Sequence, residues 1–285
     1  MGNSMKKIAW VGVGLLVIVL FIGCQEIKSL EQVLPSETGQ DQIADAIHTD
    51  TNTIDGFRSP TAIAFDSAGT MYVANWSGGT VERITRNGQR SVLASISGSP
   101  AGLACDAAGF VYVSDYKDSI YRVSPSGDIS VYAKGLHTPT GIAFNRKGDL
   151  LVTNRSSGEI VRVESGGKSS IIARGLHTPV GVVEHADGSL YVANYGYGIT
   201  RIVAGEIQTI STEFQSAGCG IVATTSGEIL AVDASGGTVK KITANGREVT
   251  SIVSGLKSPV ALAFNSSGQL FVGTWGDGSV RRLVW

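Results

Sequence analysis

Two of the four histidines in this sequence occur in identical pentapeptides. Gly-Leu-His-Thr-Pro spans residues 135–139 and again residues 175–179, and it contributes His137 and His177. An imidazole can serve as a general base, a proton donor or a metal ligand near neutral pH. The pair is therefore either part of a catalytic or metal site or one histidine copied together with a repeated structural unit.

The cysteines are the next residues with reactive side chains, and Cys24 follows an uninterrupted apolar run at residues 8–22. The run is shorter than the ~20 residues that a membrane-spanning helix needs, and it has the length of a secretory signal. The stretch Phe-Ile-Gly-Cys at residues 21–24 resembles a bacterial lipobox. This resemblance implies that residues 1–23 are a signal peptide and that Cys24 carries a lipid, with an uncleaved anchor as the alternative.

Residues 24–47 are polar and show no strand pattern, so we expect them to form a tether. A lipid on Cys24 would anchor the protein in a membrane of the bacterial cell envelope, facing the periplasm or the cell exterior. The remaining cysteines, Cys105 and Cys219, fall at different points of the repeat described below. We therefore expect them to be free and mostly buried.

The overall charge argues against a polyanionic partner. The chain has 23 Lys plus Arg against 24 Asp plus Glu, a formal net charge of -1. Nucleic acids and anionic surfaces attract basic proteins, so we expect no nucleic-acid partner. The 37 glycines accompany many strand-forming residues and only 7 prolines, which is typical of turns in a β-rich protein.

A repeat of about 40 residues fills the rest of the chain. Its register is set by six turn glycines: Gly69, Gly109, Gly148, Gly188, Gly227 and Gly268. Each block reads as four short strands joined by turns, the content of one propeller blade. Six such sheets bury their apolar faces by packing against one another in a closed ring, which leaves no sheet at an open end. The sequence therefore predicts an all-β, six-bladed β-propeller of four-stranded antiparallel blades over residues 48–285.

Ring closure makes a further prediction. The last block ends at Trp285, directly after its third strand, and residues 48–54 precede the first block where other repeats have an outer strand. We expect this N-terminal segment to complete the last blade.

The six blocks resemble the NHL repeat over residues 56–285. The resemblance rests on a Pro-x-Gly-apolar start (139–142), an aromatic-Val-Ala-Asn strand end (72–75) and an Arg-Ile pair (83–84). It implies the six-bladed fold and leaves function open, because this fold hosts enzymes, receptors and scaffolds.

Enzymes related to such propellers suggest two kinds of catalytic site. Gluconolactonase-like propellers hold a divalent cation with carboxylate and Asn ligands near the entrances of the inner strands, and streptogramin lyases use a His and Glu pair. After the block-opening proline, this chain has no carboxylate at any of the six positions: Thr61, Ala101, Thr140, Val180, Cys219 and Val260. We therefore expect no metal and no cofactor.

Polar residues end the second strand of each block: Asn75, Asp115, Asn154, Asn194, Asp233 and Thr274. Repetition favours a structural role in bonding loop backbone, with a polar central channel as the alternative.

The residue that follows each strand end varies and is mostly large: Trp76, Tyr116, Arg155, Tyr195, Ala234 and Trp275. Trp, Tyr and Arg supply much of the energy at binding interfaces. The alternative is that these rings only pack on neighbouring loops. Tyr197 lies nearby, and the loops of His137 and His177 open on the same face, so we include all three as candidate ligand contacts.

These observations favour a monomeric, lipid-anchored binding or scaffold propeller rather than an enzyme. The expected ligand is a protein, a peptide or a carbohydrate bound at the mouth of the channel. The alternative is a propeller enzyme of the lactonase or streptogramin-lyase type that acts on a small cyclic ester.

Overall fold

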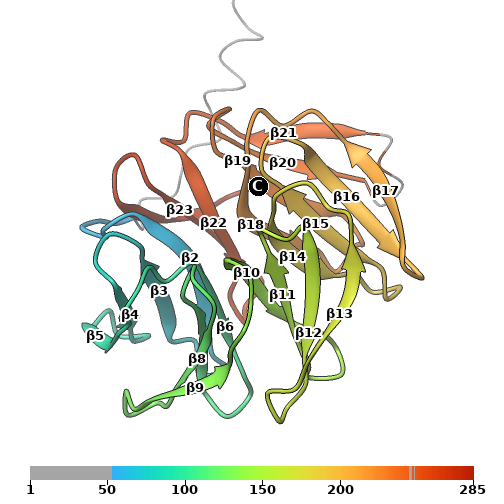
Figure 1. Ribbon diagram of the computed structural model, residues 1–285. Helices are drawn as coiled ribbons and strands as arrows, with labels where there is room; N and C mark the ends of the chain where they lie inside the picture. Colours follow the sequence, from blue (N-terminus) through green and yellow to red (C-terminus); the bar gives the residue numbers. More distant parts are fainter. Residues whose placement is uncertain (1–52, 244–245, 247) are drawn as a thin grey trace, which may run out of the picture. The chain divides into compact units, whose positions relative to one another are not determined.

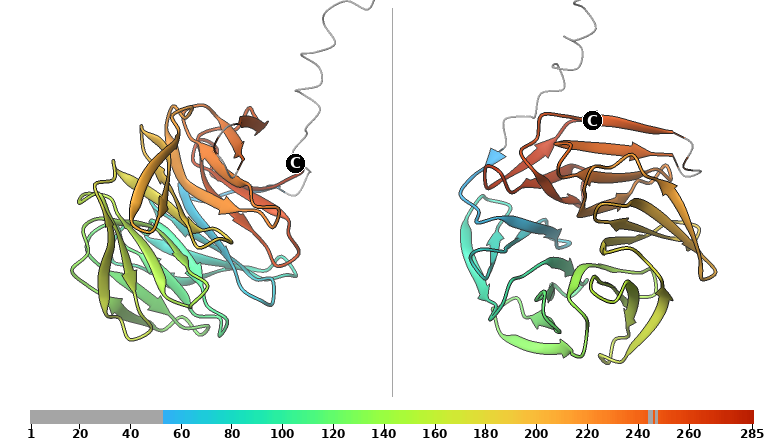
Figure 2. Two further views of the ribbon diagram at one scale, coloured as in Figure 1. Left: turned by 90° about the vertical axis from the view of Figure 1, so that its right-hand side faces the viewer. Right: turned by 45° about the horizontal axis from the view of Figure 1, so that its top comes forward.

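The structure is a computed structural model and describes residues 53–243, 246 and 248–285. Within these residues the chain forms strands β1 to β24 and no helix. The strands make six four-stranded antiparallel sheets, each of them one blade. The blades follow one another around a central axis in chain order (Figure 1 and Figure 2). The predicted fold class, an all-β six-bladed propeller, is confirmed.

In blades 1 to 5 the strands follow one another outward from the axis in chain order, and in blade 6 the outermost strand is β1. Blade 1 consists of β2 (Pro60–Phe65), β3 (Met71–Asn75), β4 (Thr80–Ile84) and β5 (Arg90–Ser95). Blade 2 consists of β6 (Gly102–Cys105), β7 (Val111–Ser114), β8 (Ile120–Val123) and β9 (Ile129–Ala133). Blade 3 consists of β10 (Pro139–Phe144), β11 (Leu150–Asn154), β12 (Glu159–Val163) and β13 (Ser169–Arg174). Blade 4 consists of β14 (Pro179–Glu184), β15 (Leu190–Asn194), β16 (Gly198–Val203) and β17 (Glu206–Ser211). Blade 5 consists of β18 (Ala217–Ala223), β19 (Ile229–Asp233), β20 (Thr238–Ile242) and β21 (Val249–Val253). Blade 6 consists of β22 (Pro259–Phe264), β23 (Leu270–Thr274), β24 (Ser279–Leu283) and β1 (Thr53–Ile54).

The outermost strand of blade 6 comes from the other end of the described chain. Thr53 and Ile54 of β1 pair with Arg281 and Val280 of β24, and Figure 2 shows this strand beside the last blade. The rest of the predicted closing strand, residues 48–52, lies outside the described residues. The same is true of the predicted signal peptide, Cys24 and the tether.

The core lies between the blades. Six apolar clusters each span one boundary between adjacent blades. One valine in the second strand of every blade is fully buried: Val73, Val113, Val152, Val192, Val232 and Val272. Burial of one such side chain contributes about 1.5–3 kcal/mol to the stability of the folded state. The repeat makes this contribution once in every blade.

Close contact between innermost strands explains the glycine of the Pro-x-Gly pattern. A Cβ atom on Gly141 would lie 2.4 Å from the carbonyl oxygen of Val180, and one on Gly181 would lie 2.4 Å from that of Cys219. These distances are far below van der Waals contact. Glycine therefore lets blades 3, 4 and 5 approach each other around the axis.

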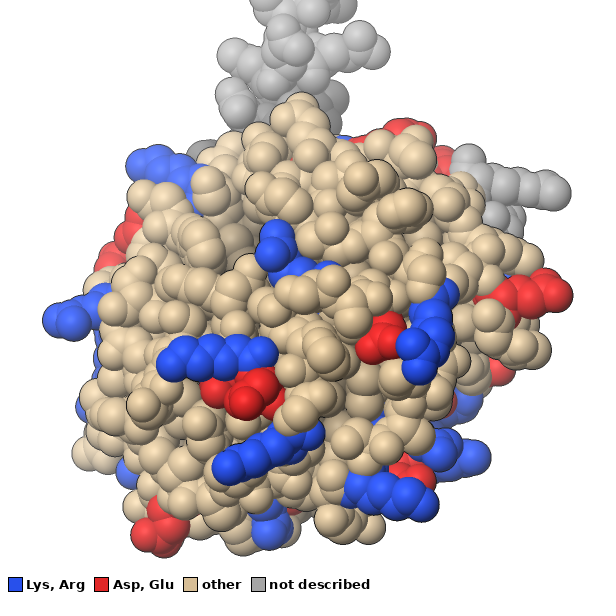
Figure 3. Space-filling model, in the orientation of Figure 1, with Lys and Arg blue, Asp and Glu red and all other residues tan. Residues whose placement is uncertain are grey.

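Charged side chains are sparse and mixed in sign on the face drawn in Figure 3, where most of the surface is uncharged. No helix that could cross a membrane occurs in the part of the chain that the structure describes.

Candidate ligand-binding site

The polar strand-end residues hold the loops at one end of the channel. Asn75 Oδ1 accepts a hydrogen bond from the backbone N–H of Arg58 at 2.9 Å, and Asp233 Oδ1 accepts one from that of Ser216 at 2.9 Å. Asp115 Oδ1 instead accepts N–H bonds from its own loop, including one from Lys117 at 2.8 Å. All six strand-end side chains are buried. The contacts of Asn75, Asp115 and Asp233 are those of the structural role favoured above. They fix the loop before the innermost strand in blades 1 and 5 and the loop after the second strand in blade 2.

A pocket of about 340 Å³ opens at this end of the channel, which we call the mouth pocket. Its lining includes five of the predicted ligand contacts, each from a different blade: Trp76, Tyr116, Arg155, Tyr195 and Trp275. Its floor includes the six residues that follow the block-opening positions: Thr61, Ala101, Thr140, Val180, Cys219 and Val260. The lining also includes Ser216, Ser235 and Ser258, which sequence reasoning did not select because serine in a loop carries no distinctive signal.

The aromatic residues of the pocket form a chain of contacts across blades 6, 1 and 2. The ring centroids of Trp275 and Trp76 are 6.2 Å apart, and those of Trp76 and Tyr116 are 4.5 Å apart with the planes at 73°. Edge-to-face contacts of this kind contribute about 0.5–1.5 kcal/mol beyond burial. The rings are therefore held in place before any ligand arrives.

Arg155 continues this chain on blade 3. Its Nη1 donates a hydrogen bond to Tyr116 Oη at 2.8 Å. Its guanidinium carbon lies 5.8 Å from the ring centroids of both Tyr116 and Tyr195, within the range of cation–π attraction. The guanidinium is thus positioned between two tyrosines from the neighbouring blades.

The pocket residues retain exposed surface. Trp275 is 41% exposed and Tyr195 is 50% exposed. Blade 5 has Ala234 at the equivalent position, so no large side chain covers the pocket from that side. Packing on neighbouring loops accounts for only part of the surface of these rings.

Tyr116 has an unusual backbone conformation. Its φ angle is +57°, in the left-handed region that non-glycine residues seldom occupy. Its loop is short: the backbone N–H of Asp115 bonds the carbonyl of Ser119, whereas blade 1 pairs Asn75 with Thr80. Blade 4 has a loop of the same length, but its positive φ angles fall on Gly196 and Gly198. The loop of blade 2 has no glycine, so Tyr116 takes the left-handed conformation, and such strain is often retained at functional sites.

The two copied histidines and Tyr197 do not line the mouth pocket. His177 is exposed and stacks on Tyr197, with ring centroids 4.5 Å apart and planes at 18°. His137 is exposed and lines a separate pocket beside Glu159. The structure therefore gives no common site to the two imidazoles.

The other two histidines are no closer to such a site. His185 lies at a turn of the opposite face, where its ring nitrogens contact Asp187 Oδ1 at 2.9 Å and the carbonyl of Gly227 at 3.1 Å. His48 lies outside the described residues.

The donor set does not fit the divalent-cation site considered in the sequence analysis. In the described part of the chain, no group of three or more His, Cys, Asp or Glu side chains is placed to bind a metal ion. The inner-strand entrances form the floor of the mouth pocket, and their side chains are hydroxyl, thiol or apolar. Hard divalent cations require carboxylate or carbonyl oxygens.

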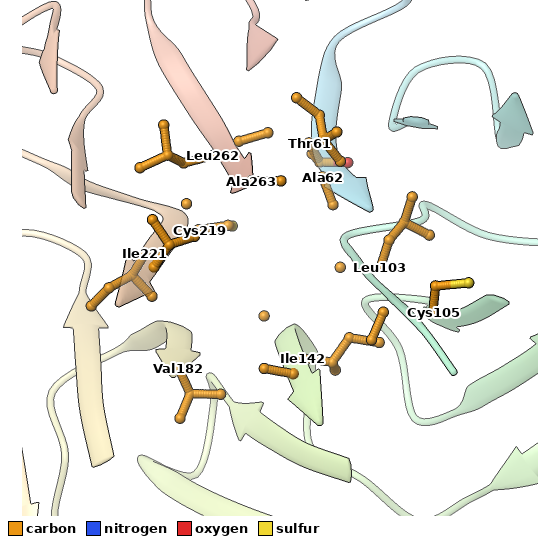
Figure 4. A pocket seen from close by; sticks show the side chains of 18 of the residues that line it. Thr61, Ala62, Leu103, Cys105, Ile142, Val182, Cys219, Ile221, Leu262 and Ala263 are labelled. Atoms are coloured by element: carbon orange, nitrogen blue, oxygen red, sulfur yellow. The ribbon is translucent and has the colours of Figure 1, made fainter. Parts of the chain in front are cut away.

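Below the mouth pocket, the central channel has a volume of about 270 Å³ (Figure 4). Small and apolar side chains surround it, among them Leu103, Ile142, Val182 and Ile221. Thr61 and Cys219 line both spaces. No charged side chain of the described residues lines the channel, which differs from the polar channel considered above.

Both described cysteines are free, as predicted, and they are partly rather than mostly buried. Burial raises the pKa of the Cys219 thiol to about 12, although the charge of Arg155 opposes the shift. Burial and the nearby carboxylates of Asp66 and Asp106 raise the pKa of Cys105 to about 12 as well. Both thiols are protonated at neutral pH, so neither is an activated nucleophile.

Comparisons with known proteins support the fold. Neither the protein-family models nor the curated sequences compared with this chain match it. Among solved structures, a gluconolactonase from Xanthomonas campestris superposes with a TM-score of 0.71 at 17% identity, covering 81% of this chain and 88% of that one. Virginiamycin B lyase from Staphylococcus aureus superposes with a TM-score of 0.65 at 20% identity, covering 82% and 85%.

A third neighbour is described as a putative oxidoreductase (glucose dehydrogenase) from Thermus thermophilus. It has a TM-score of 0.68 at 20% identity and covers 81% of this chain and 98% of that chain. At such identities the likeness shows a shared six-bladed propeller fold. The NHL resemblance stays a prediction from the repeat pattern.

Proposed function

We propose that this propeller is a binding module of the bacterial cell envelope and that its mouth pocket holds a ring-shaped group of the ligand. One observation carries the proposal: five large side chains from five blades line a single pocket. The groups that fit are a sugar ring or the side chain of a peptide. The volume of about 340 Å³ is at the small end for ligand pockets, which suits one ring with its substituents.

The side chains of the mouth pocket are rigid. Trp and Tyr offer a large contact area with few rotatable bonds, so little entropy is lost when a ligand covers them. In this pocket Trp76, Tyr116 and Arg155 already hold one another through ring contacts and a hydrogen bond. The apolar part of the floor, Ala101, Val180 and Val260, then favours the displacement of water by a flat group.

The test is a binding screen by ligand-observed NMR with monosaccharides, disaccharides and aromatic peptides. We expect the double variant Trp76→Ala, Trp275→Ala to weaken binding of every hit by at least ~30-fold, the loss typical of interface hot spots. The matched control is Trp285→Ala, because Trp285 is 48% exposed and does not line the pocket. Hits that bind the double variant as tightly as the unaltered protein would refute the proposal.

The envelope part of the proposal rests on residues 1–24, where a short apolar run precedes Cys24. A lipid on this cysteine would tether the pocket to a membrane surface. Labelled palmitate fed to cells is expected to mark the protein, and Cys24→Ser should abolish the label while Cys105→Ser keeps it. Label that persists in Cys24→Ser would remove the anchor from the proposal.

A second candidate function is catalysis on a cyclic ester, because structural neighbours are described as a gluconolactonase and a streptogramin B lyase. The pocket itself supports this less well. Its ionisable lining consists of Tyr116, Arg155, Tyr195 and Cys219, without a His, Asp or Glu. A lactonase needs a Lewis acid and a lyase needs a base within reach of its proton.

Incubation with gluconolactone and with quinupristin, followed by mass spectrometry, separates the two candidates. We expect no conversion above the rate in buffer. Conversion that disappears in Arg155→Met would replace the binding function with the enzymatic one.

A further inference from the structure

The charge of the mouth pocket is unbalanced. Arg155 is the one Lys or Arg in its lining, and no Asp or Glu lines it. Among the described residues, no carboxylate forms an ion pair with Arg155, whereas Lys240 pairs with Asp233 at 3.0 Å. The pocket therefore has one uncompensated positive charge.

The guanidinium is also incompletely used as a hydrogen-bond donor. It has five N–H groups, and within the described residues one of them is bonded, to Tyr116 Oη. Because that oxygen accepts from Arg155, the proton of the Tyr116 hydroxyl can be donated to a ligand. Arg155 and Tyr116 thus present N–H and O–H donors side by side.

The surrounding loops hold this pair of donors in place. The backbone N–H of Arg155 bonds the carbonyl of Thr138 at 3.1 Å. Asn154, one residue earlier, accepts from the N–H of His137. Tyr116 has its left-handed conformation in a glycine-free loop that Asp115 anchors. A ligand meets donors that need little reorganisation.

The charge of Arg155 acts on the interior of the pocket. It opposes the burial-driven rise of the Cys219 pKa on the pocket floor. A neutral ligand that covered Arg155 would strip water from a charged group without replacing the lost interactions, and this desolvation is costly. A carboxylate restores them, because a planar guanidinium binds a carboxylate through two parallel hydrogen bonds.

Building on the proposed binding function, we propose that the mouth pocket selects organic carboxylates: ligands in which a flat ring lies on Trp76 and Trp275 while a carboxylate bonds Arg155 and the hydroxyl of Tyr116. The single cation and its two tyrosine neighbours set the preference for a monoanion. The apolar channel beneath contributes no charge to it.

The test compares acids with their uncharged amides. Indole-3-acetate and indole-3-acetamide form one probe pair, phenylacetate and phenylacetamide another, and their dissociation constants are measured by NMR titration at pH 7. We expect the acid of each pair to bind at least about 10-fold more tightly, the factor that corresponds to a charge-assisted hydrogen bond. Arg155→Met should abolish this ratio and leave amide binding within about 3-fold.

Three further variants separate specific recognition from general electrostatics. Arg155→Lys should keep only part of the preference, because an ammonium lacks the planar fork. Tyr116→Phe should lower it by a few-fold. Arg58→Met removes an exposed cation that does not line the pocket and should leave the ratio unchanged.

The outcomes distinguish this inference from the function on which it rests. Equal binding of acid and amide, or a preference that survives in Arg155→Met, overturns the carboxylate preference. Amide binding that is still lost in Trp76→Ala, Trp275→Ala then leaves the binding function standing. If none of the four probes binds, the carboxylate inference fails, and an empty sugar and peptide screen would remove the binding function as well.

Discussion

The two faces of the propeller use their loops in different ways. On the face opposite the mouth, an Asp or Asn recurs at the same turn and makes the same hydrogen bond. The Oδ1 atoms of Asp66, Asp106, Asn145 and Asn265 accept the N–H four residues later at 2.8–2.9 Å. On the mouth face, the position after the second strand changes from blade to blade. Repetition marks what the fold needs, and variation marks what it leaves free for other uses.

Ion pairs occur on both faces. Near the opposite face Arg201 pairs with Asp187 at 2.5 Å, and on the mouth face Lys240 pairs with Asp233 at 3.0 Å. Within the lining of the mouth pocket, the described residues supply Arg155 with no acidic partner. The unpaired charge of Arg155 therefore lies where a ligand can reach it.

The largest loss of stability is expected from a substitution at a position that the repeat keeps the same. Gly181→Val would place a Cβ 2.4 Å from the carbonyl oxygen of Cys219 and 3.0 Å from Ile221 Cγ2. Gly181 lies in β14 and Cys219 in β18, and both strands are paired within their own blades, so neither backbone can move away easily. We therefore expect a loss of ~3 kcal/mol or more in the free energy of unfolding, measured by urea denaturation. Gly166→Ala is the control: a Cβ there meets nothing within 4 Å, and its effect should stay within ~0.5 kcal/mol. A mild Gly181→Val variant would mean that the inner strands do not need this glycine.

Repetition also explains how much of the fold the sequence could predict. Six turn glycines and the strand pattern predicted the blade number, the strand count and the position of the mouth loops. The aromatic residues Trp76 and Trp275 could be selected because nothing in the repeat requires them. The last two residues of the predicted closing strand, Thr53 and Ile54, pair with the last blade.

The parts that could not be predicted depend on side-chain direction and backbone angle. The histidines entered the candidate set because their loops open toward the mouth, yet His137 and His177 lie outside the pocket. The Arg155–Tyr116 bond joins two blades, and no pattern within one repeat encodes it. The serines of the pocket could not be selected because serine is common in turns of every kind.

A smaller effect concerns pH and the opposite face. Hydrogen bonds from Ser189, followed by those from His185 and Arg201, hold the pKa of Asp187 well below its usual range. Its contribution to stability is therefore fully present above the unfolded pKa of about 4 and is lost progressively as the pH falls from there through the depressed pKa of the folded state. We expect Asp187→Asn to lower stability at pH 7 by under ~1 kcal/mol, since the carboxylate is 44% exposed, and to have a smaller effect at pH 2, where part of the contribution is already lost.

Urea unfolding at both pH values measures this difference. Glu206→Gln removes an exposed carboxylate on β17 and controls for the loss of one negative charge. A deficit of Asp187→Asn that is as large at pH 2 as at pH 7 would show that Asp187 stabilises the turn without its charge.

The remaining effect is the most specific to the mouth. At Tyr116, with φ at +57°, alanine incurs a backbone penalty that glycine and asparagine largely avoid. We therefore expect Tyr116→Gly and Tyr116→Asn to be more stable than Tyr116→Ala by ~1 kcal/mol in thermal or urea unfolding. Trp76 occupies the same loop position in blade 1 without a positive φ, so there alanine should match or exceed glycine, as it does at ordinary positions. The same order of variants at both sites would mean that the strained loop does not hold Tyr116 against Arg155.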